Sequence, residues 1–192
     1  MRKLLLVVVV LGAAAWWYFG WYSQRPSDLP PVRVDESQLT EAGRKRLADV
    51  RQRIEALEKA GTESRFNEAL YISDGLRKLG DYRSAAEWYL KMIEWYEQLS
   101  PEERQHSERR PSIYMGMKPA EAPAIGSWHA GTCYFFAGEN DKAFKVMERF
   151  LQDYPRAPLR SVVLDSYNLA KKDLNGYLEA SSHLKATREY VK

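Results

Sequence analysis

The stretch Ala130-Gly131-Thr132-Cys133-Tyr134-Phe135-Phe136-Ala137-Gly138 decides the fold, together with the apolar residues that follow it. Its first part places small residues and Tyr134 on one face of a helix, where a neighbouring helix can come close. Gly138 begins a turn signal, Gly-Glu-Asn-Asp. Apolar residues then recur at spacings of three and four as far as Pro155, which is typical of an amphipathic helix. The sequence therefore predicts two short helices folded back on each other.

This pattern resembles the tetratricopeptide (TPR) repeat, which has small residues on its first helix, a turn glycine, and a second helix ended by proline. One repeat cannot bury its own apolar face, so the resemblance implies further copies. A second copy lies at about 66–99, with its turn at Gly80-Asp81-Tyr82. A weaker third copy follows Pro155, with its turn at Asn175-Gly176-Tyr177. The resemblance covers 66–99 and 124–192 and implies an all-α solenoid of about three helical hairpins within 62–192.

Composition and charge exclude several classes of protein. The 192 residues are 29% charged and 45% hydrophobic, which indicates one globular domain with appendages. The net charge is only +3, and Arg2 and Lys3 contribute two of those charges, so nucleic acid is not an expected partner. Cys133 is the single cysteine, which excludes an intrachain disulfide, and its place on an apolar helix predicts a buried, inert thiol.

Residues 4–22 form an uncharged, apolar run with aromatic residues at its C-terminal end. As a helix this run is about 28 Å long, close to the hydrocarbon thickness of a bilayer. Arg2 and Lys3 precede it, so residues 1–3 are expected in the cytoplasm and the rest of the chain on the opposite side. The alternative is a signal peptide cleaved after Ala15. We favour an uncleaved anchor, which contacts lipid through residues including Leu4, Val8, Leu11, Trp16, Trp17 and Trp21.

Two segments connect this anchor to the repeats. Residues 23–36 contain three prolines and predict an extended spacer that lifts the domain off the membrane. Residues 37–61 predict a helix, capped by Ser37 and ended by Gly61, that closes the N-terminal end of the solenoid. A short coiled-coil dimer seam is the alternative use of its apolar stripe. That stripe consists of Leu47, Val50, Ile54 and Leu57.

An insertion of about 24 residues, at about 100–123, separates the first two copies. Their turn glycines are 58 residues apart, whereas the family repeats every 34 residues or so. Loops of this length are often functional, and an apolar tip is suited to contact a partner. Folding back over the solenoid is the alternative. The candidate contact residues at the tip are Ile113, Tyr114, Met115 and Met117.

Nothing in the sequence indicates catalysis. His106, His129 and His183 have no metal-ligand spacing, and no nucleophile, phosphate-binding or dinucleotide motif occurs. We therefore expect no cofactor, no metal, no small-molecule substrate and no enzyme activity. His129, which follows Trp128, is interpreted as a packed residue. An enzyme with an unrecognised site is the least favoured alternative.

The TPR resemblance implies a protein-binding groove along the first helices of the repeats. The ending Phe150-Leu151-Gln152-Asp153-Tyr154-Pro155 is similar to TPR modules of bacterial envelope proteins. The resemblance thus implies a scaffold or accessory subunit of a membrane complex, anchored in the bacterial inner membrane and facing the periplasm. A periplasmic assembly factor with transient clients is the alternative. By the repeat register, the groove residues are Leu70, Asp74, Arg77, Lys78, Trp128, Thr132, Phe135, Phe136, Asp165, Leu169 and Lys172.

Overall fold

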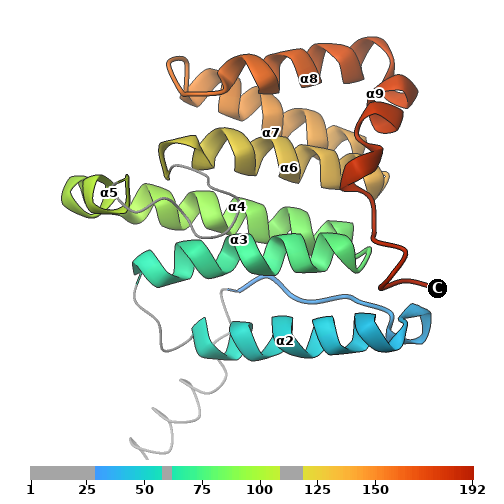
Figure 1. The fold of residues 1–192 in the computed structure, drawn as a ribbon. Coiled ribbons are helices and arrows are strands. Elements are labelled where there is room, and N and C mark those ends of the chain that lie inside the picture. Colours follow the sequence, from blue (N-terminus) through green and yellow to red (C-terminus); the bar gives the residue numbers. More distant parts are fainter. Residues whose placement is uncertain (1–28, 58–61, 109–118) are drawn as a thin grey trace, which may run out of the picture.

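The computed structural model describes residues 29–57, 62–108 and 119–192, and this part of the chain is all-α (Figure 1). The predicted fold class is therefore confirmed at the level of secondary structure. An isolated bridge between Leu39 and Val191 is the extent of β pairing in these residues. The α-helices are α2 (Glu41–Leu57), α3 (Thr62–Lys78), α4 (Tyr82–Gln98), α5 (Pro101–Glu108), α6 (Ala122–Phe136), α7 (Asn140–Asp153), α8 (Arg160–Lys172) and α9 (Leu174–Ala180), with 3₁₀ helices η1 (Glu36–Gln38), η2 (Pro119–Glu121) and η3 (Ser182–Leu184).

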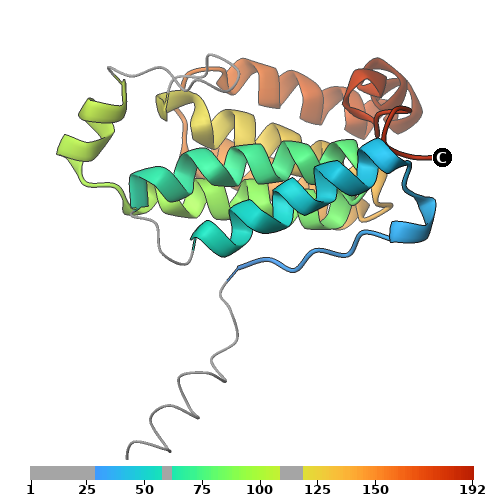
Figure 2. The ribbon, with the colours of Figure 1, turned by 60° about the horizontal axis from the view of Figure 1, so that its bottom comes forward.

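Two helical hairpins, α3–α4 and α6–α7, form the centre of the molecule. The chain reverses at Gly80 (φ 83°) and Gly138 (φ 75°), where a left-handed backbone favours glycine. Both predicted turns are confirmed. α2 packs on α3, α4 packs on α6, and α8 lies over α6 and α7, so the helices stack in layers (Figures 1 and 2).

The predicted third turn is wrong. Gly176 lies inside α9, and the turn comes earlier, at Asp173, whose side chain caps α9 by accepting a hydrogen bond from the Gly176 nitrogen at 2.9 Å. A Cβ at position 176 would meet the Asp173 carboxylate at 2.3 Å, so glycine serves a close approach there and not a reversal. α9 also ends at Ala180, and Leu184 lies in η3, so the last helix is shorter than the repeat pattern predicts.

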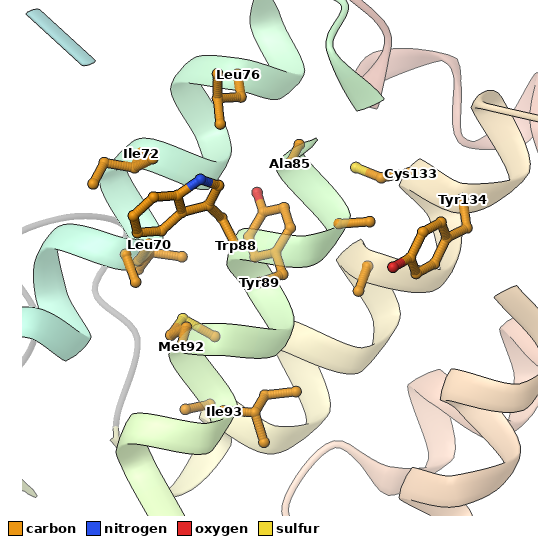
Figure 3. Packing of buried hydrophobic residues seen from close by; sticks show 14 of the residues in the cluster. Leu70, Ile72, Leu76, Ala85, Trp88, Tyr89, Met92, Ile93, Cys133 and Tyr134 are labelled. Atoms are coloured by element: carbon orange, nitrogen blue, oxygen red, sulfur yellow. The ribbon is translucent and has the colours of Figure 1, made fainter. Parts of the chain in front are cut away.

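The core centres on α4, whose aromatic side chains lie between α3 and α6 (Figure 3). Trp88 and Tyr89 are at most 1% exposed, and Trp88 meets Trp95 edge-on at 6.3 Å. Cys133 of α6 is buried in the same cluster, and burial raises the pKa of its thiol to about 12. The prediction of a buried thiol is confirmed, and such a thiol stays protonated and unreactive at neutral pH.

The N-terminal helix exists, but its cap differs from the prediction. α2 begins at Glu41, and the Thr40 hydroxyl accepts a hydrogen bond from the Gly43 nitrogen at 3.1 Å. Ser37 lies instead in η1, where the Asp35 side chain accepts from its nitrogen. The predicted cap is wrong because a 3₁₀ turn at Glu36–Gln38 precedes α2 and moves the helix start to Glu41.

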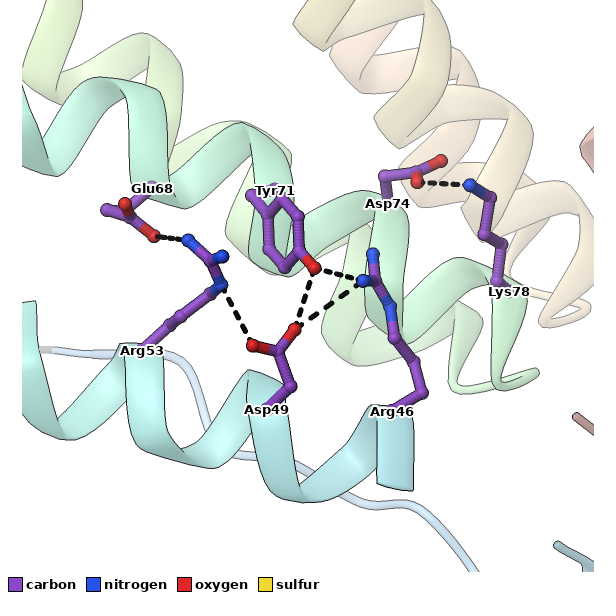
Figure 4. A network of polar contacts seen from close by, with 7 residues as sticks. All are labelled: Arg46, Asp49, Arg53, Glu68, Tyr71, Asp74 and Lys78. Atoms are coloured by element: carbon purple, nitrogen blue, oxygen red, sulfur yellow. Dashed lines mark hydrogen bonds and ion pairs between the residues drawn. The ribbon is translucent and has the colours of Figure 1, made fainter. Parts of the chain in front are cut away.

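The apolar stripe of α2 faces the rest of the domain, which favours the capping role over the coiled-coil seam. Leu47, Val50 and Leu57 are at most 1% exposed, and Ile54 packs against the main cluster. A polar network also joins α2 to α3 (Figure 4). In it, the Tyr71 hydroxyl donates to Asp49 at 2.7 Å, Arg53 pairs with Glu68 at 2.9 Å, and the Arg53 guanidinium lies 3.7 Å from the centroid of the Tyr71 ring.

Residues 29–34 are extended, as predicted, but they do not form a free spacer. Leu29, Val32 and Val34 pack against the apolar clusters. Arg33 is tied to α4, because its nitrogen donates to Asp81 at 2.6 Å and its guanidinium pairs with Glu87 at 2.8 Å. The predicted free spacer at 23–36 is thus wrong for residues 29–36, because apolar side chains of this segment are partly buried against the domain and Arg33 is held by ion pairs and hydrogen bonds.

The inserted region is also partly helical, since α5 and the start of α6 fall within 100–123. The four contact residues predicted at its tip lie outside the described residues. The predicted membrane span at 4–22 and its six anchor residues lie outside them as well. In the described ranges, no helix has the length and apolarity needed to cross a membrane.

The C-terminal tail, residues 185–192, crosses the turn end of the α3–α4 hairpin and returns to the start of α2 (Figures 1 and 2). The backbone N–H of Thr187 donates to the Lys78 carbonyl at 3.0 Å, and the backbone N–H of Thr40 donates to the Tyr190 carbonyl at 3.0 Å. The Lys192 nitrogen reaches the Gln38 carbonyl at 2.9 Å. The two ends of the domain are therefore fastened to each other.

Gly43 makes this fastening testable. A Cβ at position 43 would lie 2.2 Å from the Tyr190 carbonyl oxygen. We expect Gly43→Ala to lower the free energy of unfolding by about 1–3 kcal/mol in urea denaturation, because the tail must move. In a chain shortened by residues 187–192, the same change should be neutral or stabilising by up to about 1 kcal/mol, since alanine favours helix. Equal losses in both backgrounds would contradict the role of the tail.

Candidate protein-binding grooves

An apolar groove of about 250 Å³ lies between α6 and α8. Leu159 and Val162, on the α8 side, keep 40% and 39% of their surface exposed. Large apolar side chains in an open, apolar groove are typical of protein contact sites. We call this the α6–α8 groove, and it is lined by Ala124, Ile125, Trp128, His129, Leu159, Val162 and Val163.

Leu159 at the mouth of this groove has an unusual backbone. It precedes the first residue of α8 with φ 58° and ψ 14°, in the left-handed region. That conformation costs an L-residue with a Cβ roughly 1–2 kcal/mol. Strained residues of this kind concentrate where a side chain must be held in a particular place, and here the result is an exposed leucine at the groove.

His129 forms part of the wall of the groove from within the core. It is 4% exposed, stacks on the Tyr89 ring at 5.0 Å, and lies 4.7 Å from the Trp128 ring. Burial, and secondarily the nearby Arg77 cation, lower the pKa of His129 to about 4. Its Nδ1 atom has no hydrogen-bond partner among the described residues. The imidazole is therefore neutral at physiological pH and acts as a packing group, as the sequence predicts.

A buried ion pair lies on α3, the first helix of the first hairpin, where η3 covers it. Arg77 donates to Asp74 at 2.5 Å and to the Leu184 carbonyl at 2.8 Å, and Lys78 pairs with Asp74 at 2.8 Å. Asp74 is 4% exposed and Arg77 is 7% exposed. Both were predicted to face a partner, but in the structure they hold η3 against α3.

Other residues of the predicted groove are also buried instead of facing a partner. Tyr177 of α9 contacts Thr132 at 2.5 Å and Phe135 at a ring distance of 5.5 Å, which covers the C-terminal part of α6. The repeat register assumes an open face, and α9 and the tail fill part of it. Buried residues of the predicted set are Leu70, Asp74, Arg77, Thr132 and Phe135, whereas Lys78, Trp128, Phe136, Asp165, Leu169 and Lys172 keep some exposure.

Trp128 is the predicted residue that lines the α6–α8 groove. Sequence reasoning missed the α8 side of it, because the register pointed to Asp165, Leu169 and Lys172 in the later turns of that helix. The sequence feature that could have indicated this side is the group of apolar residues after Pro158, at the start of α8: Leu159, Val162 and Val163.

A second and larger groove, of about 590 Å³, lies between α4 and α7. Its volume falls within the roughly 300–1,000 Å³ of many ligand sites. We call it the α4–α7 groove. Apolar side chains of both helices and charged side chains of both signs line it, and Pro30 of the extended segment borders it.

Comparison of this chain with protein-family models, with curated proteins and with solved structures found no match. The TPR family therefore remains a resemblance. Within the part of the chain that the structure describes, no group of three or more His, Cys, Asp or Glu side chains is placed to hold a metal. The functional proposals below rest on the geometry of the two grooves.

Proposed function

We propose that this protein is a non-catalytic, TPR-like scaffold or accessory subunit that binds a protein partner in the α6–α8 groove. The observation that carries the proposal is the exposure of Leu159 and Val162 in an apolar groove. An aromatic or branched apolar side chain of a partner suits a site of this size and polarity. The paired helices with turn glycines Gly80 and Gly138 support the TPR-like assignment.

The proposal includes attachment to a membrane. The uncharged run at 4–22 provides the anchor, and the positive charges before it place the helical domain on the far side of a bacterial inner membrane, in the periplasm. A scaffold in this position would hold a partner that is itself part of a membrane or envelope complex.

The Leu159→Gly variant tests the groove without damage to the fold. Glycine relieves the left-handed strain, so the free energy of unfolding should stay unchanged or rise by up to about 1 kcal/mol. Loss of the leucine contact should reduce partner retention about tenfold, since a buried leucine contributes roughly 1.5–3 kcal/mol. The measurement is purification of the full-length protein in mild detergent from membranes, with mass spectrometry of the bait and its partners.

Leu169→Ala is the matched control, because Leu169 is 42% exposed on the same helix but does not line the groove. It should retain the partner at the wild-type level. A partner kept by Leu159→Gly and lost by Leu169→Ala would place binding on the later turns of α8. The absence of any stoichiometric partner in the wild type would reject the subunit proposal.

A further inference from the structure

One segment of this chain shows how an extended peptide packs on α4, the second helix of the α3–α4 hairpin. Residues 29–34, here called the seated segment, lie extended beside α4 and α2 (Figure 2). Their apolar side chains contact the core, and Arg33 is fixed to Asp81, the N-cap residue of α4, and to Glu87 of α4. Asp81 also caps α4 by accepting from the Ser84 nitrogen at 3.1 Å. An extended segment with several apolar side chains and one arginine therefore packs against α4.

The α4–α7 groove lies next to this segment along α4 and has matching features. Leu90 and Ile93 of α4 and Val146 and Phe150 of α7 supply apolar side chains. Charged residues follow the edges of both helices. Glu87, which holds Arg33 of the seated segment, also lines this groove, so the two positions are adjacent.

The charges of the groove differ between its two edges. On the α4 edge, Glu87 pairs with Arg33, Glu94 with Lys91 at 2.9 Å, and Glu97 accepts a hydrogen bond from Tyr154. On the α7 edge, Arg149 is 80% exposed and makes a single 3.2 Å contact with Asp153. Lys145 has no ion-pair partner among the described residues. The α7 edge therefore offers an occupant the cations of Lys145 and the largely exposed Arg149, whereas Glu97 on the α4 edge is hydrogen-bonded by a hydroxyl that carries no charge.

The chain outside the structure places this groove near the proposed membrane. Six residues, 23–28, separate the predicted span from Leu29. Six residues reach at most about 20 Å. Pro30 borders the groove, so a partner segment in it would also emerge close to the bilayer.

We propose that the α4–α7 groove binds an extended juxtamembrane segment of a membrane-protein partner. Side chains of an extended segment alternate, so one set packs on the apolar side chains and an acidic side chain of the other set meets Lys145 and Arg149. This inference rests on the proposed membrane-anchored function. It adds a second contact surface and the chemistry of the segment that occupies it.

The test places a photo-crosslinking amino acid, p-benzoylphenylalanine, in the full-length chain in host membranes. Position Val146 samples the α4–α7 groove, Val162 samples the α6–α8 groove, and the exposed Arg188 of the tail serves as the control. Crosslinked peptides are sequenced by mass spectrometry. We expect Val146 to crosslink to one segment, next to a transmembrane span of another protein, with apolar residues in alternation and an acidic residue.

Charge reversal then tests the recognition. With the crosslinker at Leu90, Lys145→Glu should lower the yield about fivefold, the upper range for one exposed ion pair. Lys172→Glu on α8 changes the net charge equally and should leave the yield unchanged. A lysine in place of the partner's acidic residue should restore the yield with Lys145→Glu.

The alternative outcomes separate this inference from the proposed function. Crosslinks to a membrane protein from Val162 but not from Val146 would overturn the inference and leave the function standing. Crosslinks from Val146 to phospholipid, or to a second copy of this chain, would also overturn it. Yields no higher than that of Arg188 at both positions would overturn both proposals.

Discussion

Replacement of Asp74 by alanine is expected to lower the free energy of unfolding by about 3–5 kcal/mol. The variant would leave the buried Arg77 cation with uncharged oxygen partners, the Leu184 carbonyl and the Tyr89 hydroxyl, in place of a carboxylate. An uncompensated charge at 7% exposure is costly, because it has lost water without gaining an anion. Urea denaturation at pH 7 measures the effect as a lower transition midpoint with an unchanged slope.

The double variant Asp74→Ala/Arg77→Met separates a buried charge from a packing defect. It removes both members of the pair and replaces the arginine with an apolar side chain, so it should recover much of the loss. If the double variant is as unstable as the sum of the two single variants, the pair is not coupled. The explanation of the loss by an uncompensated charge would then be wrong.

The sequence predicts those parts of the fold that local chemistry determines. The turns at Gly80 and Gly138 and the apolar stripe of α2 follow from spacing and backbone conformation, and each is confirmed. The prediction of the third turn was wrong, although it used the same signal as the first two, a glycine. A glycine at position 176 looks like a turn residue, but it is there because the Asp173 carboxylate lies against the start of α9.

Contacts between distant segments could not be predicted from periodicity. Arg33 lies in a proline-containing stretch that reads as a spacer, yet it is held by residues about 50 positions later. The tail returns to Thr40 over an even longer separation. Both segments make some apolar contacts with the domain, but the hydrogen bonds and ion pairs that fix their positions leave no periodic signal in the sequence.

The predicted groove and the α6–α8 groove share one residue, Trp128. The repeat register placed the predicted groove on the first helices, where the α6–α8 groove lies. The register assumed that every first helix presents the same positions to solvent. α9 and η3 break that equivalence, since they bury Thr132 and Arg77, and the open part of the surface moves to the start of α8.

Acidification is expected to destabilise the domain through His129. Its pKa is about 4 in the folded state, against about 6.5 when exposed in the unfolded chain. Between these pH values the unfolded chain binds a proton that the folded protein does not, so stability falls as pH decreases from about 6.5 to about 4. The loss amounts to about 3 kcal/mol in total. Urea midpoints measured at intervals across this range would record it.

His129→Phe provides the comparison, because an aromatic ring keeps the contact with Tyr89 and cannot take up a proton. Carboxylates contribute equally to both proteins, so the difference between the two pH profiles isolates the histidine. The variant should be less sensitive to acid by about 3 kcal/mol over the same interval. Identical profiles would mean that His129 is protonated within the fold, and a cation in the wall of the α6–α8 groove would be incompatible with an apolar occupant. The pH profile thus tests both the buried state of the histidine and the chemistry proposed for the groove that it helps to form.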